Sequence, residues 1–406
     1  MNETLELEPR GQTPVWGRFA PWAAGLAAVC GGYATGDGVS DWNVTHWLFT
    51  YDLEFTRRAL VGTLVWGMVE PDPDLARRLG VGLLIGCSAA LILFAAWSLR
   101  GRPAAFRAGF AVLTVACPAT LTQFGYDCGR LDQLNLILFL AALVLIVRGP
   151  VAAPLGVALL TAIALLVHEA FLIIHVPVLV GMMIHRSGGR VNRGLVLVGA
   201  VALIVTALVT RFGSLDAVDH ETYRSQLVER HSLDERSVYY SSRVLYRELP
   251  ENIAFAIRTL PGRFLRWHAL PIAVLLTPWV WAALVTLRSL RAEIDPARRR
   301  GFWLPVIAAA SPLLLAAVGL DLFRWWALSV LNLLVVTLVL VRIHAEAGAR
   351  LRLGWRGITL LVGLGLLAGP VGVDSPLPRG RVARALVEDA VRPALRKPIH
   401  RPDDMP

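Results

Sequence analysis

Eleven apolar runs, each 15 to 21 residues long, follow one another through this 406-residue sequence. An α-helix rises 1.5 Å per residue and the hydrocarbon core of a bilayer is roughly 30 Å thick, so about 20 apolar residues cross it. The mean hydropathy of +0.57 and the 17% of charged residues exclude an ordinary soluble domain. The sequence therefore predicts an all-α protein, a polytopic transmembrane helical bundle of about eleven spans: 19–36, 79–99, 108–124, 133–147, 151–167, 170–185, 194–210, 268–287, 302–319, 325–341 and 357–373.

Two stretches between or within these runs need a separate interpretation. The continuous apolar stretch 151–185 is too long for one span, and the pair His168-Glu169 supplies a break, which predicts a helical hairpin. The segment 59–69 is too short to cross, so we expect a re-entrant or interfacial helix there. The long segment 211–267 mixes Leu, Val, Tyr and Arg at spacings that permit one or two amphipathic helices on the membrane surface, or a plain structured connector.

The distribution of arginine predicts the orientation of the spans. Short cytoplasmic loops retain more Lys and Arg than outer loops do. Arginine-rich and arginine-poor loops alternate here as the spans require, which places the N-terminus in the cytoplasm. The arginine-rich loops are 100–107, 186–193, 288–301 and 342–356, and the outer segments are 37–78, 125–132, 168–169, 211–267 and 320–324.

This topology divides the chain into three parts. Residues 1–18 form a cytoplasmic N-terminal segment, 19–373 form the transmembrane domain, and 374–406 form a polar C-terminal tail. The tail falls outside although it is basic; if 357–373 does not cross fully, the tail lies inside and ten spans remain. We expect a multi-pass protein of the bacterial inner membrane.

An acidic residue stands three positions before an arginine at three predicted outer span ends. Two side chains at this spacing share one helical face, so each pair can simply neutralise itself. The adjoining spans are short, however, and ionisable groups below the membrane surface are tolerated where they face one another or a water-filled cavity. The sequence therefore predicts one shared polar cavity at the outer face. The three pairs are Glu54 with Arg57, Asp127 with Arg130, and Asp321 with Arg324.

Chemical roles follow from the residue types in these outer segments. A carboxylate desolvated at an interface has a raised pKa and can take a proton from a sugar hydroxyl, and arginine can hold a lipid phosphate or pyrophosphate. Sugar rings also stack on aromatic faces such as those of Trp42 and Trp47. The candidate catalytic residues are Asp41, Asp52, Glu54 and Asp127, and the candidate phosphate- or substrate-binding residues are Arg57, Arg58, Arg130, Asp132, His168, Glu169, Asp321 and Arg324.

Metal and cofactor motifs give no positive indication. His168 and His175 are seven positions apart with no third ligand nearby, so we predict no metal site in the protein itself. A divalent cation that bridges a carboxylate and a pyrophosphate stays open as a cofactor. The motifs of soluble nucleotide-binding, hydrolase and zinc-protease sites are absent from the sequence, and the net charge of +10 accompanies no nucleic-acid motif.

The layout resembles that of the GT-C glycosyltransferases and of the O-antigen polymerases and ligases of bacterial envelopes. The first outer loop, DGVSDWNVTHWLFTYDLEFTRR at 37–58, carries acids, several outer loops carry arginine, and one long outer loop lies between late spans. The resemblance implies a polyprenyl-phosphate or polyprenyl-pyrophosphate sugar donor used at the outer face. It implies Asp41, Asp52 or Glu54 as the base by likeness to GT-C enzymes, and a reliance on outer-loop arginine by likeness to the polymerases.

The sequence therefore predicts an integral membrane glycosyltransferase or glycan polymerase of envelope polysaccharide or glycoconjugate synthesis. Its partners would be a polyprenyl-linked sugar, membrane lipid and a glycan or lipid acceptor, with no nucleic acid. The alternative is a transporter or flippase of a lipid-linked or anionic solute, and an assembly protein without catalysis is a third interpretation. The sequence indicates neither the sugar nor the oligomeric state.

Overall fold

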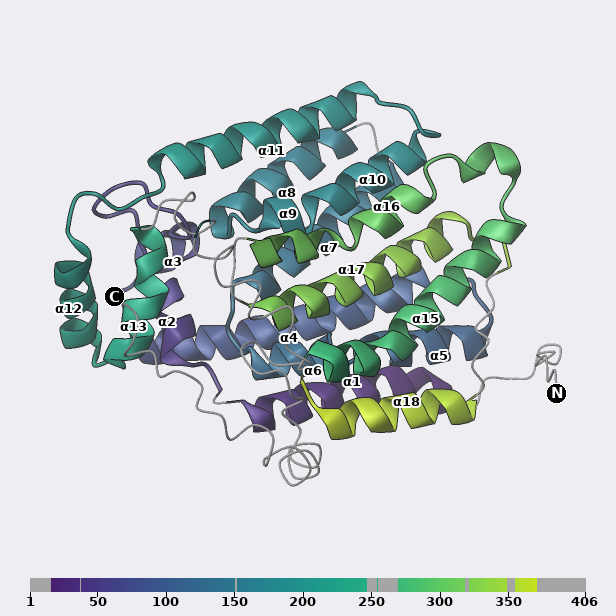
Figure 1. The fold of residues 1–406 in the computed structure, drawn as a ribbon, viewed down its shortest axis with the longest axis horizontal. Helices are drawn as coiled ribbons and strands as arrows, with labels where there is room; N and C mark the ends of the chain where they lie inside the picture. Colours follow the sequence, from purple (N-terminus) through teal and green to yellow (C-terminus); the bar gives the residue numbers. More distant parts are fainter. Residues whose placement is uncertain are drawn as a thin grey trace.

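The structure is a computed structural model, and it describes residues 16–36, 38–149, 152–246, 254, 269–317, 321–348 and 355–370. Within these ranges every regular element is a helix (Figure 1). The all-α fold class is confirmed, and each of the eleven predicted apolar runs coincides with one helix or with two short ones. The C-terminal tail 374–406 and most of the segment 1–18 lie outside the described residues.

Eight of the apolar runs form uninterrupted helices. α8 begins with Pro154 in its first turn, where the missing N–H costs nothing, and α7 ends at Gly149, whose φ of 61° is left-handed. These signals set the helix ends where the hydropathy pattern predicts them. The eight helices are α1 (Trp16–Thr35), α4 (Pro73–Ser98), α7 (Asp132–Arg148), α8 (Ala153–Val167), α11 (Arg193–Phe212), α15 (Ala269–Glu293), α17 (Leu322–Ile343) and α18 (Trp355–Ala368).

The other three runs are each broken near a proline. Proline removes a backbone donor and disrupts the helix at that point. The broken runs are α5 (Ala104–Val115) with α6 (Leu121–Tyr126), α9 (Phe171–Ile174) with α10 (Val176–Arg186), and α16 (Trp303–Ala308) with the 3₁₀ helix η3 (Ser311–Ala317).

Polar side chains occupy two of these breaks. Because residue 118 is proline, the carbonyl of Thr114 has no helical N–H partner, and the Thr120 hydroxyl donates to it at 2.7 Å. At the second break, Asn332 of α17 donates to the carbonyl of Ile174 at 2.7 Å, and its amide oxygen lies 3.1 Å from Nδ1 of His175. The polar side chains thus compensate the backbone within an apolar surrounding.

Short helices gather at one end of the bundle, on the left in Figure 1. Asp219 and Asp234 cap two helices in the described part of the segment 211–267, where the sequence permitted one or two amphipathic helices or a plain connector. The remainder of that segment, apart from residue 254, lies outside the described residues from 247 onward. The short helices are α2 (Asp41–Trp47), α3 (Leu60–Trp66), α12 (His220–His231), α13 (Glu235–Ser242) and η1 (Arg243–Leu245), and η2 (Pro296–Arg299) lies in a loop at the opposite end.

Helix α17 lies at the centre of the bundle and packs against α15, α4, α7 and η3. Its second half is almost entirely buried: the fully buried apolar side chains are Leu331, Val335, Val336, Leu338, Val339, Leu340 and Val341, and the polar Asn332 and Thr337 are fully buried as well. A helix that is buried on all sides is enclosed by close-packed neighbours. It therefore holds the residues at its first turn in a fixed place relative to its neighbours.

Helices α1 and α6 are in backbone contact. A Cβ atom at Gly32 would lie 2.0 Å from the carbonyl oxygen of Thr122, and one at Gly125 would lie 2.4 Å from that of Val29. Small residues allow this close approach, as they do between helices in membranes. The contact fixes α6 and the turn that follows it.

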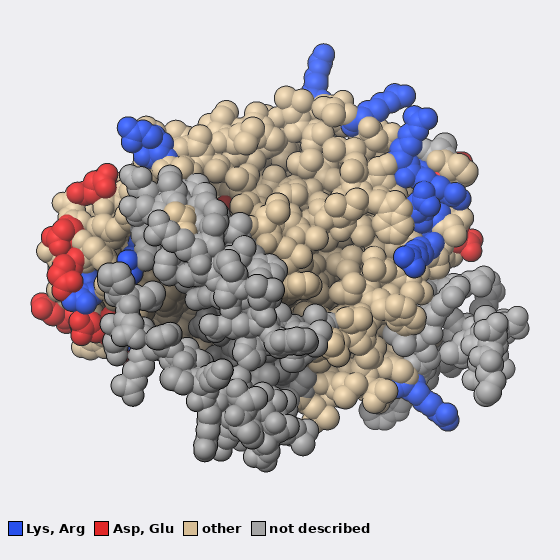
Figure 2. Space-filling view, viewed as in Figure 1, with Lys and Arg blue, Asp and Glu red and all other residues tan. Residues whose placement is uncertain are grey.

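Among the residues that the structure describes, three helices are long and apolar enough to cross a membrane: Pro73–Ser98, Arg193–Phe212 and Arg324–Ile343. Large apolar side chains are exposed on the outward faces of the peripheral helices, among them Ile85 and Leu93 of α4, Leu159 of α8, and Leu203 of α11. Figure 2 shows a broad uncharged surface between an acidic end, where α12 and α13 lie, and an opposite end rich in Lys and Arg. Shorter apolar helices, such as Ala104–Val115 and Ala153–Val167, accompany them.

Candidate functional site

Eight ionisable side chains from four separate segments form one network at the end of the bundle that carries α2 and α3. We call this the outer ionic network, after the predicted outer segments that supply its members. It joins the turn between α6 and α7 to the break after α8, the first turn of α17 and the loop before α3. Its members are Arg58, Asp127, Arg130, Asp132, His168, Glu169, Asp321 and Arg324.

The turn between α6 and α7 brings three members together. Gly129 adopts a φ of 83°, and a Cβ there would lie 2.8 Å from Val39 Cγ1, so this tight turn requires glycine. Asp127 follows the last residue of α6, and Asp132 begins α7. The two carboxylates and Arg130 therefore emerge from a turn of six residues that the contact between α1 and α6 holds in place.

Arg324 connects α17 to α7. Its Nη1 donates to Oδ2 of Asp321 at 3.0 Å and its Nη2 donates to Asp132, while the guanidinium carbon lies 4.8 Å from the ring centroid of Trp325. Only 9% of the Arg324 side chain and 11% of the Asp132 side chain are exposed. A buried pair of this kind requires both partners, because either charge alone would lack compensation.

Arg130 lies at longer distances from two carboxylates. Its Nη1 is 3.9 Å from Oδ2 of Asp127 and its Nη2 is 3.9 Å from Oδ2 of Asp321. Both distances exceed the reach of a direct hydrogen bond. The guanidinium is thus attracted by both acids without being fixed on either by these contacts.

Glu169 and His168 lie on the far side of Asp132. Nε of Arg58 donates to both carboxylate oxygens of Glu169 at 3.1 Å, and its Nη2 adds a further bond. Nδ1 of His168 accepts the N–H of Ala170 at 3.1 Å, which leaves its Nε2 to face Asp132 Oδ1 at 3.9 Å. Arg58 is one of two non-glycine residues with positive φ in the described chain, at 66°, a conformation typical of functional loops.

Burial and the neighbouring charges set the protonation of the loop members. Burial raises the pKa of Asp127, and Arg130 opposes this effect only in part. Burial would also raise the pKa of Glu169, but Arg58 and His168 hold it well below its ordinary value. Burial and the charge of Arg58 lower the pKa of His168 to about 4, so its imidazole is neutral near pH 7.

A small cavity of about 20 Å³ lies inside the network, enough for about one water molecule. Nε2 of Gln123 donates to Oδ2 of Asp127 at 2.7 Å and so orients that carboxylate at the cavity wall. The predicted hollow between the charged groups is therefore narrow among the described residues, because the side chains fill the space by pairing with one another. The polar residues that line the cavity are Gln123, Asp127, Arg130, Asp132, Gln133 and Arg324.

Four of the sequence candidates lie outside the network, and three of them join segments that are distant in sequence. Asp41 accepts from Nη2 of Arg77 and from the N–H of Asp234, both at 2.8 Å. Glu54 accepts the backbone N–H of Ala217 at 2.8 Å.

Of the other two candidates, Arg57 also joins distant segments, whereas Asp52 forms a bond within its own loop. Arg57 donates to the carbonyl of Gly213 at 3.0 Å, and Asp52 accepts from Thr50 at 2.7 Å. Trp47, a predicted stacking surface, is buried and donates to the carbonyl of Gly129 at 2.8 Å. These contacts position the loops around the network.

Sequence reasoning missed His46. Burial first, and then the charges of Arg58, His168 and Arg130, lower its pKa well below the ordinary value, which places the ring beside the network. Its Nε2 is buried and has no hydrogen-bond partner among the described residues. The available signal was its position on α2, one turn after Trp42, whose ring it meets edge to face at 5.9 Å.

The described residues contain no group of three or more His, Cys, Asp or Glu side chains that could hold a metal ion. No protein-family model, no curated protein and no solved structure matches this chain.

Proposed function

We propose that the chain is a multi-pass protein of the bacterial inner membrane in which all eleven apolar runs cross or enter the bilayer. The exposed leucines and isoleucines of α4, α8 and α11 support this, because a water-facing surface of that size would be unstable. The separation of charge in Figure 2 supports the orientation, with the arginine-rich end in the cytoplasm and the outer ionic network on the other side.

We infer that the outer ionic network transfers a sugar from a polyprenyl-phosphate or polyprenyl-pyrophosphate carrier to a glycan or lipid acceptor. The observation that carries this inference is the convergence of three arginines and four carboxylates from distant segments at the ends of apolar helices. Such groups are costly at this depth and are typical of functional sites. This arrangement fits a donor whose phosphate is charged and whose tail is lipid.

Asp127 is the residue best suited to act as the base. Its raised pKa brings it closer to neutrality, and Gln123 holds one of its oxygens at the cavity wall. Asp127 would take the proton of the acceptor hydroxyl, the acceptor oxygen would bond to the anomeric carbon, and the bond from that carbon to the phosphate oxygen would break. The polyprenyl phosphate or pyrophosphate leaves with the electron pair.

Arg130 is the residue best suited to bind the phosphate. It lines the cavity of the network and lies 3.9 Å from Asp127, the proposed base, so a phosphate bound by its guanidinium would lie beside that carboxylate. Arg324, in contrast, is held by Asp132 and Asp321 and buried against Trp325, which suits it to a positioning role.

A transporter of a lipid-linked or anionic solute is the second candidate, and one observation favours it. Discontinuous helices such as α5 with α6 and α9 with α10 are typical of transporter binding sites near the bilayer midplane. The carboxylates and arginines of the outer ionic network lie at one end of the bundle instead, and the two side chains that donate to the carbonyls at these breaks, Thr120 and Asn332, are neutral.

Binding of a polyprenyl phosphate to the purified protein in nanodiscs tests the proposed site. We expect wild type to bind polyprenyl phosphate and not the uncharged polyprenol, and Arg130→Gln to weaken binding roughly tenfold through loss of a charge-assisted contact. Arg230→Gln, on the exposed surface of α12, is the matched control and should bind as wild type. Equal affinities of the Arg130 variant and wild type would reject the site.

Sugar transfer from a radiolabelled polyprenyl-phosphate donor separates the two candidates. An enzyme releases polyprenyl phosphate and forms a new glycoside, and Asp127→Asn should abolish both products. Movement of an intact lipid-linked sugar across proteoliposomes, without either product, would favour the transporter.

A further inference from the structure

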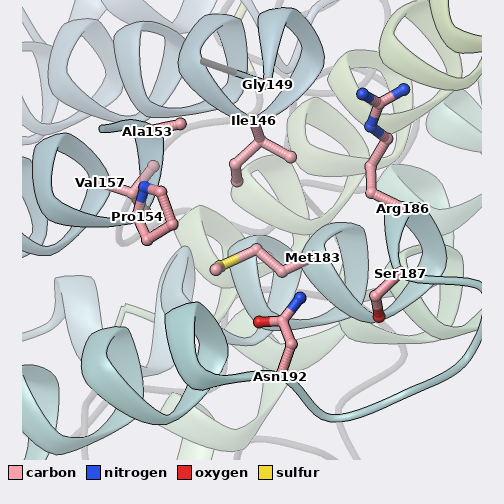
Figure 3. A pocket seen from close by; sticks show the side chains of 9 residues that line it. All are labelled: Ile146, Gly149, Ala153, Pro154, Val157, Met183, Arg186, Ser187 and Asn192. Atoms are coloured by element: carbon pink, nitrogen blue, oxygen red, sulfur yellow. The ribbon is translucent and has the colours of Figure 1, made fainter. Parts of the chain in front are cut away.

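A second cavity lies at the arginine-rich end of the bundle, opposite the outer ionic network, and measures about 260 Å³. It is bounded by the end of α7, the start of α8, the end of α10 and the residue before α11. Figure 3 shows side chains from all four elements around one space. Its apolar wall consists of Ile146, Ala153, Pro154, Val157 and Met183, and Arg186, Ser187 and Asn192 form its polar edge.

Three sources of positive potential meet at this cavity. Arg186 contributes a guanidinium at its edge, and none of the residues that line the cavity is acidic. Helices α8 and α11 both begin here, and the positive ends of their dipoles lie at the wall. The N-terminus of α11 is capped by Asn192, whereas Ala152 leaves α8 without a capping side chain. A cationic ligand would be repelled by this potential, and an anion would be attracted.

Gly149 keeps space beside the guanidinium. A Cβ at this position would lie 3.2 Å from Nη2 of Arg186, and the φ of 61° independently disfavours any other residue. The Arg186 head group therefore lies against bare backbone at the cavity edge. It can accept a bulky anion without a side chain between them.

The exterior next to the cavity is apolar. Leu155 and Leu159 of α8 follow Pro154 along the helix and are 66% and 60% exposed, and Val196 of α11 is 60% exposed. A ligand whose anionic group lies at Arg186 in this cavity can thus extend its other end over an apolar surface. Basic pockets between membrane helices on the cytoplasmic side bind anionic lipid head groups for this reason.

We propose that this cavity binds an anionic phospholipid, with the phosphate at Arg186 and the start of α8 and an acyl chain along the exposed leucines of α8. The combination of one guanidinium, two helix N-termini, an apolar wall and an adjoining apolar exterior matches an amphiphile and not a free anion. The lipid would fill the space between α8 and α10 and stabilise their packing at the cytoplasmic end.

Native mass spectrometry of the full chain, released from nanodiscs of mixed phosphatidylglycerol and phosphatidylcholine, tests the proposal. Wild type should retain phosphatidylglycerol in preference to phosphatidylcholine. Arg186→Gln should reduce that preference roughly tenfold, because a charge-assisted phosphate contact is lost. Arg190→Gln removes an equal charge from the same exposed loop outside the cavity and should retain the preference.

A further variant keeps the test independent of folding. Ala153→Leu fills the cavity without changing the charge and should also release the lipid, while the helical circular dichroism stays unchanged.

Equal losses in the Arg186 and Arg190 variants would assign the preference to general surface charge and overturn the proposal. Displacement of the bound lipid by millimolar inorganic phosphate alone would also overturn it, because the site would then bind a free anion.

Discussion

The buried pair of Arg324 and Asp132 offers a quantitative test of how the outer ionic network is held together. Replacing Arg324 with methionine preserves the length of the side chain but leaves the carboxylate of Asp132, 11% exposed, without its nearest cation. Removing one partner of a buried pair costs about 3–5 kcal/mol. Loss of the contact with the Trp325 ring adds about 0.5–2 kcal/mol.

A double-mutant cycle isolates the pair from these additional effects. Asp132→Asn alone leaves Arg324 its bond to Asp321, so we expect a smaller loss than for Arg324→Met. The loss of unfolding free energy in the double variant should be smaller than the sum of the losses in the two single variants, by at least about 1.5 kcal/mol. Unfolding by denaturant in detergent micelles, followed by tryptophan fluorescence, gives the four free energies.

The matched control is the exposed pair of Arg298 and Glu346, whose side chains are 67% and 60% exposed. Its coupling energy should lie between zero and about 1 kcal/mol, because water screens it. If the losses for Arg324 and Asp132 add to within about 0.5 kcal/mol, the two side chains do not compensate each other. The account of the network as a mutually neutralised buried cluster would then be refuted.

Three other predictions concern the loops and the packing of the bundle. The raised pKa of Asp127 means that ionisation of this carboxyl group opposes folding. Asp127→Asn should therefore leave the free energy of unfolding unchanged below about pH 4 and increase it progressively as the pH rises through the pKa of the folded state. A difference in unfolding free energy between the variant and wild type that stays constant across pH 3–8 would contradict this expectation. Gly32→Ala should destabilise the protein by about 1–3 kcal/mol, because the added methyl group would overpack the contact with α6. Gly31→Ala, whose added Cβ would meet nothing within 4 Å, should change the melting temperature little. Single cysteines at Arg236 and Arg298, in a background without the exposed native cysteine, should label from opposite sides of intact cells; labelling of both from the same side would exclude the proposed orientation.

The positions of the helices could be predicted because the signal is local. An apolar run of 15 to 21 residues favours one helix whatever its neighbours are. The break in the stretch 151–185 at His168-Glu169 was also predictable, and α8 ends at Val167 in the structure. The interruptions near Pro118 and Pro312 were less evident, because a proline in a span can bend a helix without ending it.

The candidate site was predictable as a region and not as a set of contacts. Of the three acid and arginine pairs at i, i+3, Asp321 with Arg324 forms a hydrogen bond, Asp127 with Arg130 forms a longer ion pair, and Glu54 faces the segment after α11. The pairs that join the network, Arg58 with Glu169 and Asp132 with Arg324, are 111 and 192 positions apart in sequence. No local pattern specifies contacts of that range, since they depend on how the helices pack.

The compensated helix breaks change how a substitution in an apolar span should be judged. By hydropathy alone, replacing Thr120 with valine and Asn332 with leucine should make the protein more stable in a membrane. Yet Thr120 donates a hydrogen bond to the carbonyl of Thr114, and Asn332 donates one to the carbonyl of Ile174. Both carbonyls lie where an apolar run is interrupted. An apolar residue at either site would remove the hydrogen bond to a buried carbonyl oxygen, so the more hydrophobic variant is the less stable protein.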